Sequence, residues 1–199
     1  MKSACLKGRV VRVTRRQPGL KKFKAQGENL LGKMCKPTAI DQIWVADVTY
    51  IKIKGRWQYL ATMMDLYSRR ILGWSLSTTR TTELTRAAMT YALKKRGNPK
   101  GVLLHTDRGA EYLGNEFQKM LLKNEFRHSL NRPGHCTDNA FMESFFHTLK
   151  TELIRGTLYR NARELRRSVA AYINQFYNTV RLHSGLDYLS PIEYEQRVG

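Results

Sequence analysis

Residues 43–53 read Ile-Trp-Val-Ala-Asp-Val-Thr-Tyr-Ile-Lys-Ile, and this stretch decides the fold class. It is rich in β-branched and aromatic residues, and its end alternates between polar and apolar side chains, which is typical of a strand. The tripeptide Lys54-Gly55-Arg56 favours a hairpin turn. Residues 57–64 and 70–77 then predict two more strands, so the three together predict an antiparallel meander.

The rest of the chain predicts alternating helices and strands. A helix is expected from a cap at Thr81 or Thr82 to a stop at Gly97, because apolar residues recur between them at helical spacing. Further strands are expected at 102–105 and 126–130, with helices at 115–123, at 137 to about 155 and at 161 to about 180. This order predicts an α/β fold with a mixed sheet flanked by helices, as in a ribonuclease H-like architecture.

Charge divides the chain into three expected regions. The 199 residues carry 35 Lys or Arg and 16 Asp or Glu, a formal net charge of +19 that indicates a polyanionic partner such as nucleic acid. Residues 1–40 hold eleven basic residues and one acid, and they predict a basic arm or the remnant of an upstream linker. Residues 41–156 are expected to form the core, and residues 157–199 a helical extension.

Composition excludes several classes. No run approaches the roughly 18 apolar residues of a membrane span, and the N-terminus has no apolar region typical of a secretory signal. Cys5, Cys35 and Cys136 are widely spaced, which favours reduced thiols in a cytoplasmic protein over a disulfide framework or a zinc site. We therefore expect a cytoplasmic protein that is not associated with a membrane.

Three carboxylates are candidates for a metal site. Asp47 lies within the first predicted strand, Asp107 lies at the end of the fourth, and Glu143 lies in the helix after Thr137. Carboxylates gathered in one place repel one another, and a divalent cation removes that penalty. Oxygen ligands of this kind suit Mg²⁺ or Mn²⁺, and two such ions can promote cleavage of a phosphodiester.

The helix that carries Glu143 has a polar edge beside its apolar stripe. At about 100° per residue, Asn139, Glu143 and Lys150 lie along that edge, where a lysine could contact a phosphate. For Lys150 a solvated surface charge is the alternative interpretation. For Asn139 the alternative is a residue of the first helical turn, which helical periodicity alone favours.

The sequence resembles the integrase catalytic core of DDE transposases, specifically the second-frame (OrfB-type) product of bacterial insertion sequences, a family related to retroviral integrases. The resemblance is carried by WVADVTYI at 44–51, HTDRGAEY at 105–112 and DNAFMESFFHTLK at 138–150. MDLYSRRILGW at 64–74 and YNTVRLHSGL at 177–186 also match, so the likeness covers about residues 29–196.

This resemblance implies a function and a set of site residues. Asp47, Asp107 and Glu143 become the catalytic, metal-binding triad for two Mg²⁺ ions, for which Mn²⁺ could substitute. The implied reaction is DNA transposition in two in-line steps without a covalent enzyme intermediate: water cuts a strand at the end of the element, and the freed 3′ hydroxyl attacks another phosphodiester. The residues expected to contact DNA are Lys150, Asn139, Arg108, Arg181 and His183.

The resemblance also implies partners, and two departures leave alternatives open. Self-association on transposon ends and target DNA is expected, and a product of a preceding frame is a further expected partner. The resemblance also implies a bacterial protein associated with the nucleoid. Glu111 stands where the family usually has Gln, and only about forty residues precede Asp47. The alternatives are therefore a truncated, inactive module that binds DNA or a partner transposase, and a sequence-tolerant nuclease. Asp65 is expected to be structural, with a supporting role at the metal site as its alternative.

Overall fold

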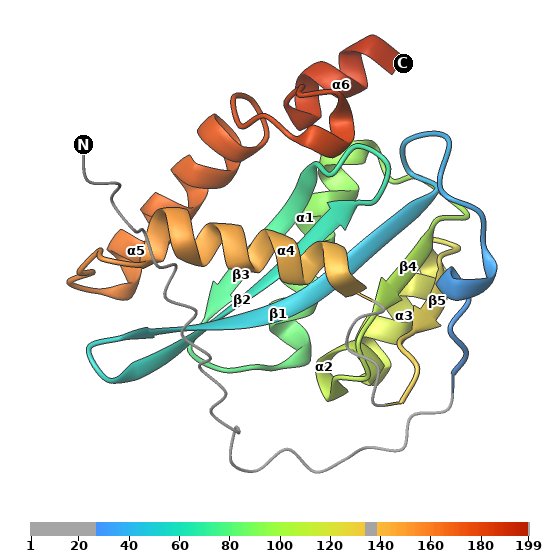
Figure 1. The fold of residues 1–199 in the computed structure, drawn as a ribbon. Helices are drawn as coiled ribbons and strands as arrows, with labels where there is room; N and C mark the ends of the chain where they lie inside the picture. The colour runs from blue at the N-terminus through green and yellow to red at the C-terminus, as the bar shows by residue number, and fades with distance from the viewer. Residues whose placement is uncertain (1–26, 134–138, 199) are drawn as a thin grey trace.

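A computed structural model describes residues 27–133 and 139–198, and its centre is a five-stranded sheet in the order β3-β2-β1-β4-β5 (Figure 1). The strands are β1 (Ile43–Ile53), β2 (Arg56–Asp65), β3 (Ile71–Ser77), β4 (Leu103–Thr106) and β5 (Arg127–Leu130). β1, β2 and β3 pair antiparallel, whereas β4 pairs in parallel with both β1 and β5. The predicted meander and the predicted mixed sheet are both confirmed.

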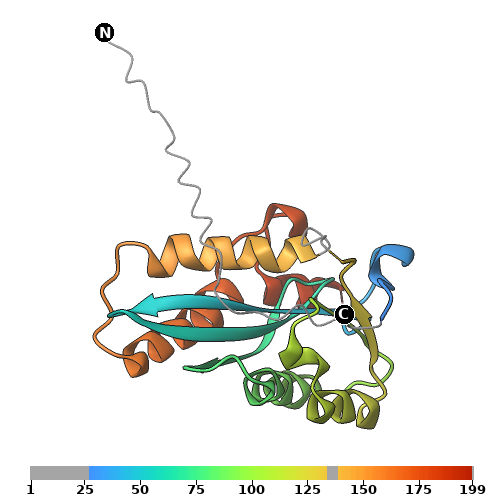
Figure 2. The same cartoon turned by 90° about the horizontal axis from the view of Figure 1, so that it is seen from below.

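Helices cover both faces of this sheet (Figure 2). One face carries α1 (Thr82–Arg96), α2 (Ala110–Leu113) and α3 (Asn115–Lys123), and the other carries α4 (Ala140–Leu149) and α5 (Ala162–Ala171). The last regular helix is α6 (Pro191–Val198). Short helical segments complete the described chain: η1 (Leu31–Lys33), η3 (Lys150–Ile154), η4 (Tyr172–Tyr177) and η5 (Ser184–Leu186).

Successive side chains of β1 alternate between two separate apolar layers, one on each face of the sheet. Val45 and Ile51 join the layer formed with α4 and α5, whereas Trp44 and Ala46 join the layer formed with α1 and α3. Because successive strand residues point to opposite faces, Asp47 shares the face of Val45, the face that α4 covers. The direction of this carboxylate is therefore set by the apolar pattern of its own strand.

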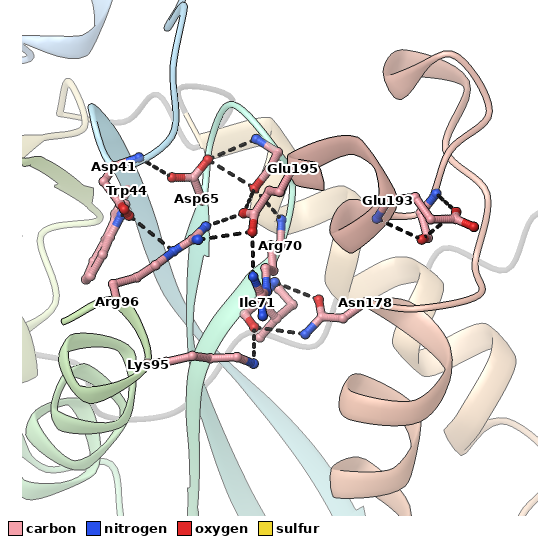
Figure 3. Close-up of polar contacts among 12 residues, drawn as sticks. Asp41, Trp44, Asp65, Arg70, Ile71, Lys95, Arg96, Asn178, Glu193 and Glu195 are labelled. Carbon is pink, nitrogen blue, oxygen red and sulfur yellow. Dashed lines mark hydrogen bonds and ion pairs between the residues drawn. The ribbon is translucent and has the colours of Figure 1, made fainter. Parts of the chain in front are cut away.

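The C-terminal helix α6 is held to the core by a buried ionic cluster (Figure 3). Glu195 accepts hydrogen bonds from Ser68 Oγ at 2.6 Å and Arg96 Nη1 at 3.0 Å, and it also pairs with Arg70. Arg96 pairs in turn with Asp41 at 3.2 Å. Burial opposes ionisation of Glu195, but its hydrogen bonds from Arg96, Ser68 and Arg70 outweigh burial and hold its pKa below the ordinary value.

Both outer strands of the sheet are engaged by other parts of the chain. At β3, the Asn178 side chain accepts from Ile71 N at 2.9 Å and donates to Ile71 O at 3.0 Å (Figure 3). At β5, Leu130 N donates to Glu28 O at 3.0 Å, and Ser129 Oγ accepts from the backbone of Leu30 at 2.9 Å.

The helices differ in detail from the sequence expectations. The four-residue α2 was not predicted, and the helices expected to run to about 155 and 180 each change to a wider π turn, at Lys150 and at Tyr172. Residues 1–26 of the expected basic arm and the expected helix start at Thr137 lie outside the described residues. None of the described helices is long and apolar enough to cross a membrane.

Candidate active site

Asp47 and Asp107 occupy matching positions on neighbouring parallel strands. Val45 of β1 is paired in register with His105 of β4, and each aspartate lies two residues beyond its member of that pair. Neighbouring strands lie about 4.8 Å apart, so equivalent positions on β1 and β4 bring their side chains close together. The parallel pairing of β1 with β4 therefore creates a two-carboxylate site at the C-terminal end of β4.

The electrostatics show that these two carboxylates influence each other. Burial, followed by the negative charge of Asp107, raises the pKa of Asp47 to about 7. One oxygen of Asp47 accepts from Val48 N at 2.7 Å, which partly opposes this increase. Burial lowers the pKa of Lys150, while the charge of Asp47 acts in the opposite direction. A pair of hard oxygen donors that disfavour joint ionisation suits a divalent cation, which would relieve the repulsion.

Arg80 forms ion pairs with two carboxylates, those of Asp107 and Glu111. Arg80 Nη2 lies 3.2 Å from Asp107 Oδ2, and Arg80 Nε donates to Glu111 Oε1 at 2.6 Å. Asp107 Oδ1 accepts from Gly109 N at 2.9 Å, and a Cβ at Gly109 would overlap the Glu111 carboxylate. The side chain of Glu111 is 3% exposed, so this departure from the family pattern contributes a paired, buried charge.

Replacing Arg80 with Met should destabilise the protein, and replacing Glu111 with Gln at the same time should restore most of the loss. Arg80→Met alone leaves a buried carboxylate unpaired, which we expect to lower the free energy of unfolding by about 3 kcal/mol. Urea unfolding of the four proteins of this double-mutant cycle, without metal, measures the coupling. Strictly additive changes in the free energy of unfolding would contradict a coupling between Arg80 and Glu111. The matched control Lys119→Met breaks an exposed pair with Glu116 and should change nothing measurable.

A chain of hydrogen bonds from α3 through β5 and β4 reaches the backbone carbonyl of Asp107. Gln118 Nε2 lies 3.0 Å from His128 Nδ1, and His128 Nε2 lies 2.9 Å from Thr106 Oγ1. The Thr106 hydroxyl donates to Asp107 O at 2.8 Å. Because Gln118 can only donate through this nitrogen, His128 accepts at Nδ1 and donates at Nε2, which requires a neutral ring.

Acidification should therefore destabilise the protein through His128. Burial, and then the charge of His105, lowers the pKa of His128 to about 4, compared with 6.5 ordinarily. The unfolded chain binds more protons between these values, so this stabilisation is complete above pH 6.5 and is lost as the pH falls toward 4. Between pH 7 and pH 4.5, urea unfolding should show that the unaltered chain loses about 2–3 kcal/mol relative to His128→Gln. His128→Gln should show a correspondingly smaller pH dependence; equal slopes would contradict the assignment.

Helix α4 begins beside Asp47. Asn139 Nδ2 donates to Ala46 O at 2.9 Å, which fixes the start of α4 on β1 at the residue before Asp47. Glu143 lies in the first turn of this helix and is exposed. Lys150, at the other end, places its Nζ 4.9 Å from the centre of the Tyr50 ring. Between 27 and 133 and between 139 and 198, no three His, Cys, Asp or Glu side chains come close enough to hold a metal ion, so convergence of Glu143 with the two aspartates stays a prediction.

The structure gives the expected DNA-contact residues different surroundings. Asn139 is only 3% exposed and packs α4 on β1, so its position corresponds to the first-turn alternative, and its contact with DNA stays a prediction. Arg108 Nε donates to Asn131 O at 2.7 Å, and Arg181 pairs with Glu152 at 3.1 Å. For Lys150, Arg108, Arg181 and His183, DNA contact stays a prediction.

Asp65 has a structural position at the end of β2. Its carboxylate accepts from the backbone N–H groups of Asp41 at 2.7 Å and Ser68 at 2.9 Å, and the residue is fully buried. Sequence reasoning missed Arg80, because a lone arginine between a strand and a helix carries no periodic signal. Only the acid at position 111, noted as a departure, indicated that a counter-charge was needed.

Comparisons with known protein families agree with this geometry. Residues 37–136 match the family model described as "Integrase core domain", and residues 124–191 match a second model of the same description. The transposase for insertion sequence element IS904 of Lactococcus lactis is 39% identical over 168 residues, covering 84% of this chain and 66% of that protein. Transposase InsF for insertion sequence IS3A of Escherichia coli is 39% identical over 170 residues, covering 85% and 59%. The chain thus spans about three fifths to two thirds of these relatives.

Solved structures support the fold. The magnesium complex of the HTLV-2 integrase catalytic core domain superposes with a TM-score of 0.64 at 22% identity, covering 79% of this chain and 98% of that domain. A simian T-cell lymphotropic virus intasome chain superposes with a TM-score of 0.68 at 18% identity, covering 86% and 58%. The ribonuclease H-like fold expected from the sequence is confirmed.

Proposed function

Because the chain belongs to the integrase core domain family, we propose that it is a DNA transposase that cuts and joins strands at the ends of an insertion sequence. The observation that carries this proposal is the matched placement of Asp47 and Asp107 on β1 and β4, with the raised pKa of Asp47. The net charge of +19 supports attraction to a DNA backbone.

The donor set fits divalent cations. Asp47 and Asp107 would hold the metal from the sheet, and Glu143 would complete the site from the first turn of α4. Bound Mg²⁺ would assist attack on a phosphodiester and stabilise the leaving oxygen. The use of two ions, and the replacement of Mg²⁺ by Mn²⁺, belong to this proposal.

The chain's own residues would hold and orient the DNA. Arg80 and the Gly109 N–H fix the two oxygens of Asp107, so that this carboxylate is oriented before DNA binds. Lys150 lies near enough to Asp47 for that charge to affect its pKa, and its ammonium would contact the phosphate next to the cleaved bond. Copies of the chain would act together on paired ends, and a protein from a preceding frame is a further proposed partner.

A nicking and joining assay tests this proposal. Protein and Mg²⁺ are incubated with labelled DNA that does or does not carry the terminal inverted repeats of the element. Nicked and joined strands that require the repeats support a transposase, and EDTA should abolish both products. Products without dependence on repeats would indicate a nuclease. Salt-sensitive binding without any product would indicate the alternative, an inactive module that binds DNA. This second candidate is retained because the chain matches only 66% and 59% of the length of its relatives.

A further inference from the structure

A cavity of about 620 Å³ lies where α4, the turn between β2 and β3, and the segment after η4 meet. Its volume falls within the range of small-molecule sites and exceeds what one phosphate needs. On α4 it is lined by Phe141, Ser144 and Thr148, which lie on a different side of the helix from Glu143 and Lys150. None of its lining residues, all within the described chain, is acidic.

Arg69 brings a positive charge to this cavity; burial lowers its pKa, and Tyr177 and the Asp65 carboxylate oppose this decrease only in part. Its guanidinium carbon stacks 3.5 Å from the centre of the Phe141 ring. Arg69 Nη1 is buried and has no hydrogen-bond partner, and no carboxylate of the described residues forms an ion pair with this side chain. A guanidinium remains charged at all relevant pH values, and burying it without a counter-charge is costly. An anionic group in the cavity would remove this cost.

His183 adds a hydrogen-bonding group of a different kind. Its ring lies edge-on to Tyr177, with 4.9 Å between ring centres, and bonds to the Tyr177 backbone. Nε2 is buried and has no partner. Burial, together with the charges of Arg181 and Arg69, lowers the pKa of His183 to about 4, so the ring is neutral at pH 7. Since a neutral ring that donates to a carbonyl through Nδ1 has a lone pair on Nε2, this atom suits an N–H donor rather than a phosphate oxygen.

Exposed aromatic rings border the same cavity. Tyr188 is 69% exposed and Phe141 is 41% exposed. Aromatic rings of this kind stack on unpaired bases without strict sequence preference. The cavity thus combines a site for an anion, an acceptor for a base edge and a stacking surface.

We propose that this cavity binds one unpaired nucleotide of a DNA strand, with its phosphate at Arg69 and its base at His183 and Tyr188. This inference rests on the proposed function as far as DNA is the ligand, but it does not depend on cleavage. Since Phe141 is the second residue of α4, a strand held here would pass the start of that helix. The nucleotide would come from a single-stranded stretch beside the element end, since a paired base cannot enter.

Binding assays in EDTA test the cavity separately from catalysis. Two duplexes of the same sequence are compared, one blunt and one with a short single-stranded tail that contains 2-aminopurine. The full chain should bind the tailed duplex about tenfold more tightly, and the aminopurine fluorescence should change on binding. Arg69→Gln and Tyr188→Ala should each bring the affinity ratio close to one. Tyr188 is exposed, so its variant keeps the test decisive if Arg69→Gln does not fold, as judged by thermal unfolding.

Matched variants on other parts of the surface distinguish a specific nucleotide site from general attraction of DNA to basic residues. Arg167→Gln removes an exposed arginine on α5, and Tyr91→Ala removes an exposed tyrosine on α1; both should keep the tail preference. The proposal is overturned if the unaltered chain shows no preference, or if Arg69→Gln and Arg167→Gln weaken both duplexes equally. It is also overturned if free dAMP binds the cavity and the tail does not compete. Failure of nicking with Mg²⁺ would contradict the proposed function alone.

Discussion

Asp47→Asn should abolish Mg²⁺-dependent nicking and joining while making the metal-free protein more stable. Loss of a residue that merely supports a metal ligand typically costs 10–100-fold, so we expect loss of a ligand to exceed about 100-fold. The stability gain has a separate cause. Because the folded pKa of Asp47 is about 7, ionising this carboxylate opposes folding increasingly as pH rises from 3.8 to 7. At pH 8 the neutral amide should raise the free energy of unfolding by about 4 kcal/mol.

Two measurements separate these effects. Strand products on element-end DNA report catalysis, and thermal unfolding with and without Mg²⁺ reports stability and metal binding. Mg²⁺ should stabilise the unaltered chain and have little effect on Asp47→Asn. The matched control is Asp187→Asn, which changes an exposed aspartate distant in sequence from Asp47. This variant should leave both the strand products and the thermal unfolding unchanged. Retained nicking by Asp47→Asn would refute the assignment of the site.

Glu195→Ala should produce the largest loss of stability, about 3–5 kcal/mol. This carboxylate is the counter-charge for Arg70 and Arg96, and its side chain is only 9% exposed. Removing it leaves Arg70 without its acid and leaves Arg96 with Asp41 alone. Urea unfolding measures the loss, and limited proteolysis between η5 and α6 should accelerate because α6 is released from the core.

The neighbouring Glu193 provides the control for this prediction. It lies in the same helix and accepts from Ser190 N at 2.9 Å, which closes a capping box at the helix start. Glu193→Ala should therefore affect stability far less than Glu195→Ala. Similar losses for both variants would show that α6 is held by its cap rather than by the ionic cluster.

Much of the fold was predictable because local pattern and tertiary structure agree. The alternation at the end of β1, the turn at Lys54-Gly55 and the stop at Gly97, which has φ of 70°, are local signals that the structure retains. The side chain of Asn161 accepts from Glu164 N at 2.9 Å, which caps the helix expected from residue 161. Asp47 and Asp107 were predictable as candidates because each is a carboxylate carried by a predicted strand, Asp47 within the first and Asp107 at the end of the fourth.

The rest depends on contacts between distant residues. Glu195 lies 125 residues from Arg70, and Arg80 lies 31 residues from Glu111; no periodicity marks such pairs. Helical spacing placed Asn139 on a polar edge, but its amide is used to fix α4 on β1. The π turn at Lys150 also escapes a calculation at constant rotation per residue, since that turn is wider.

The engagement of both outer strands has a consequence for assembly. Asn178 occupies the hydrogen-bonding positions of Ile71, and residues 28–31 cover the end of β5, so an incoming strand finds these backbone groups already taken. Unpaired outer strands are the usual template for fibril growth and for strand exchange between molecules. Under the proposed function, copies of the chain gather on DNA, and the engaged backbone groups at Ile71 and at the end of β5 would disfavour pairing between their sheets at these positions.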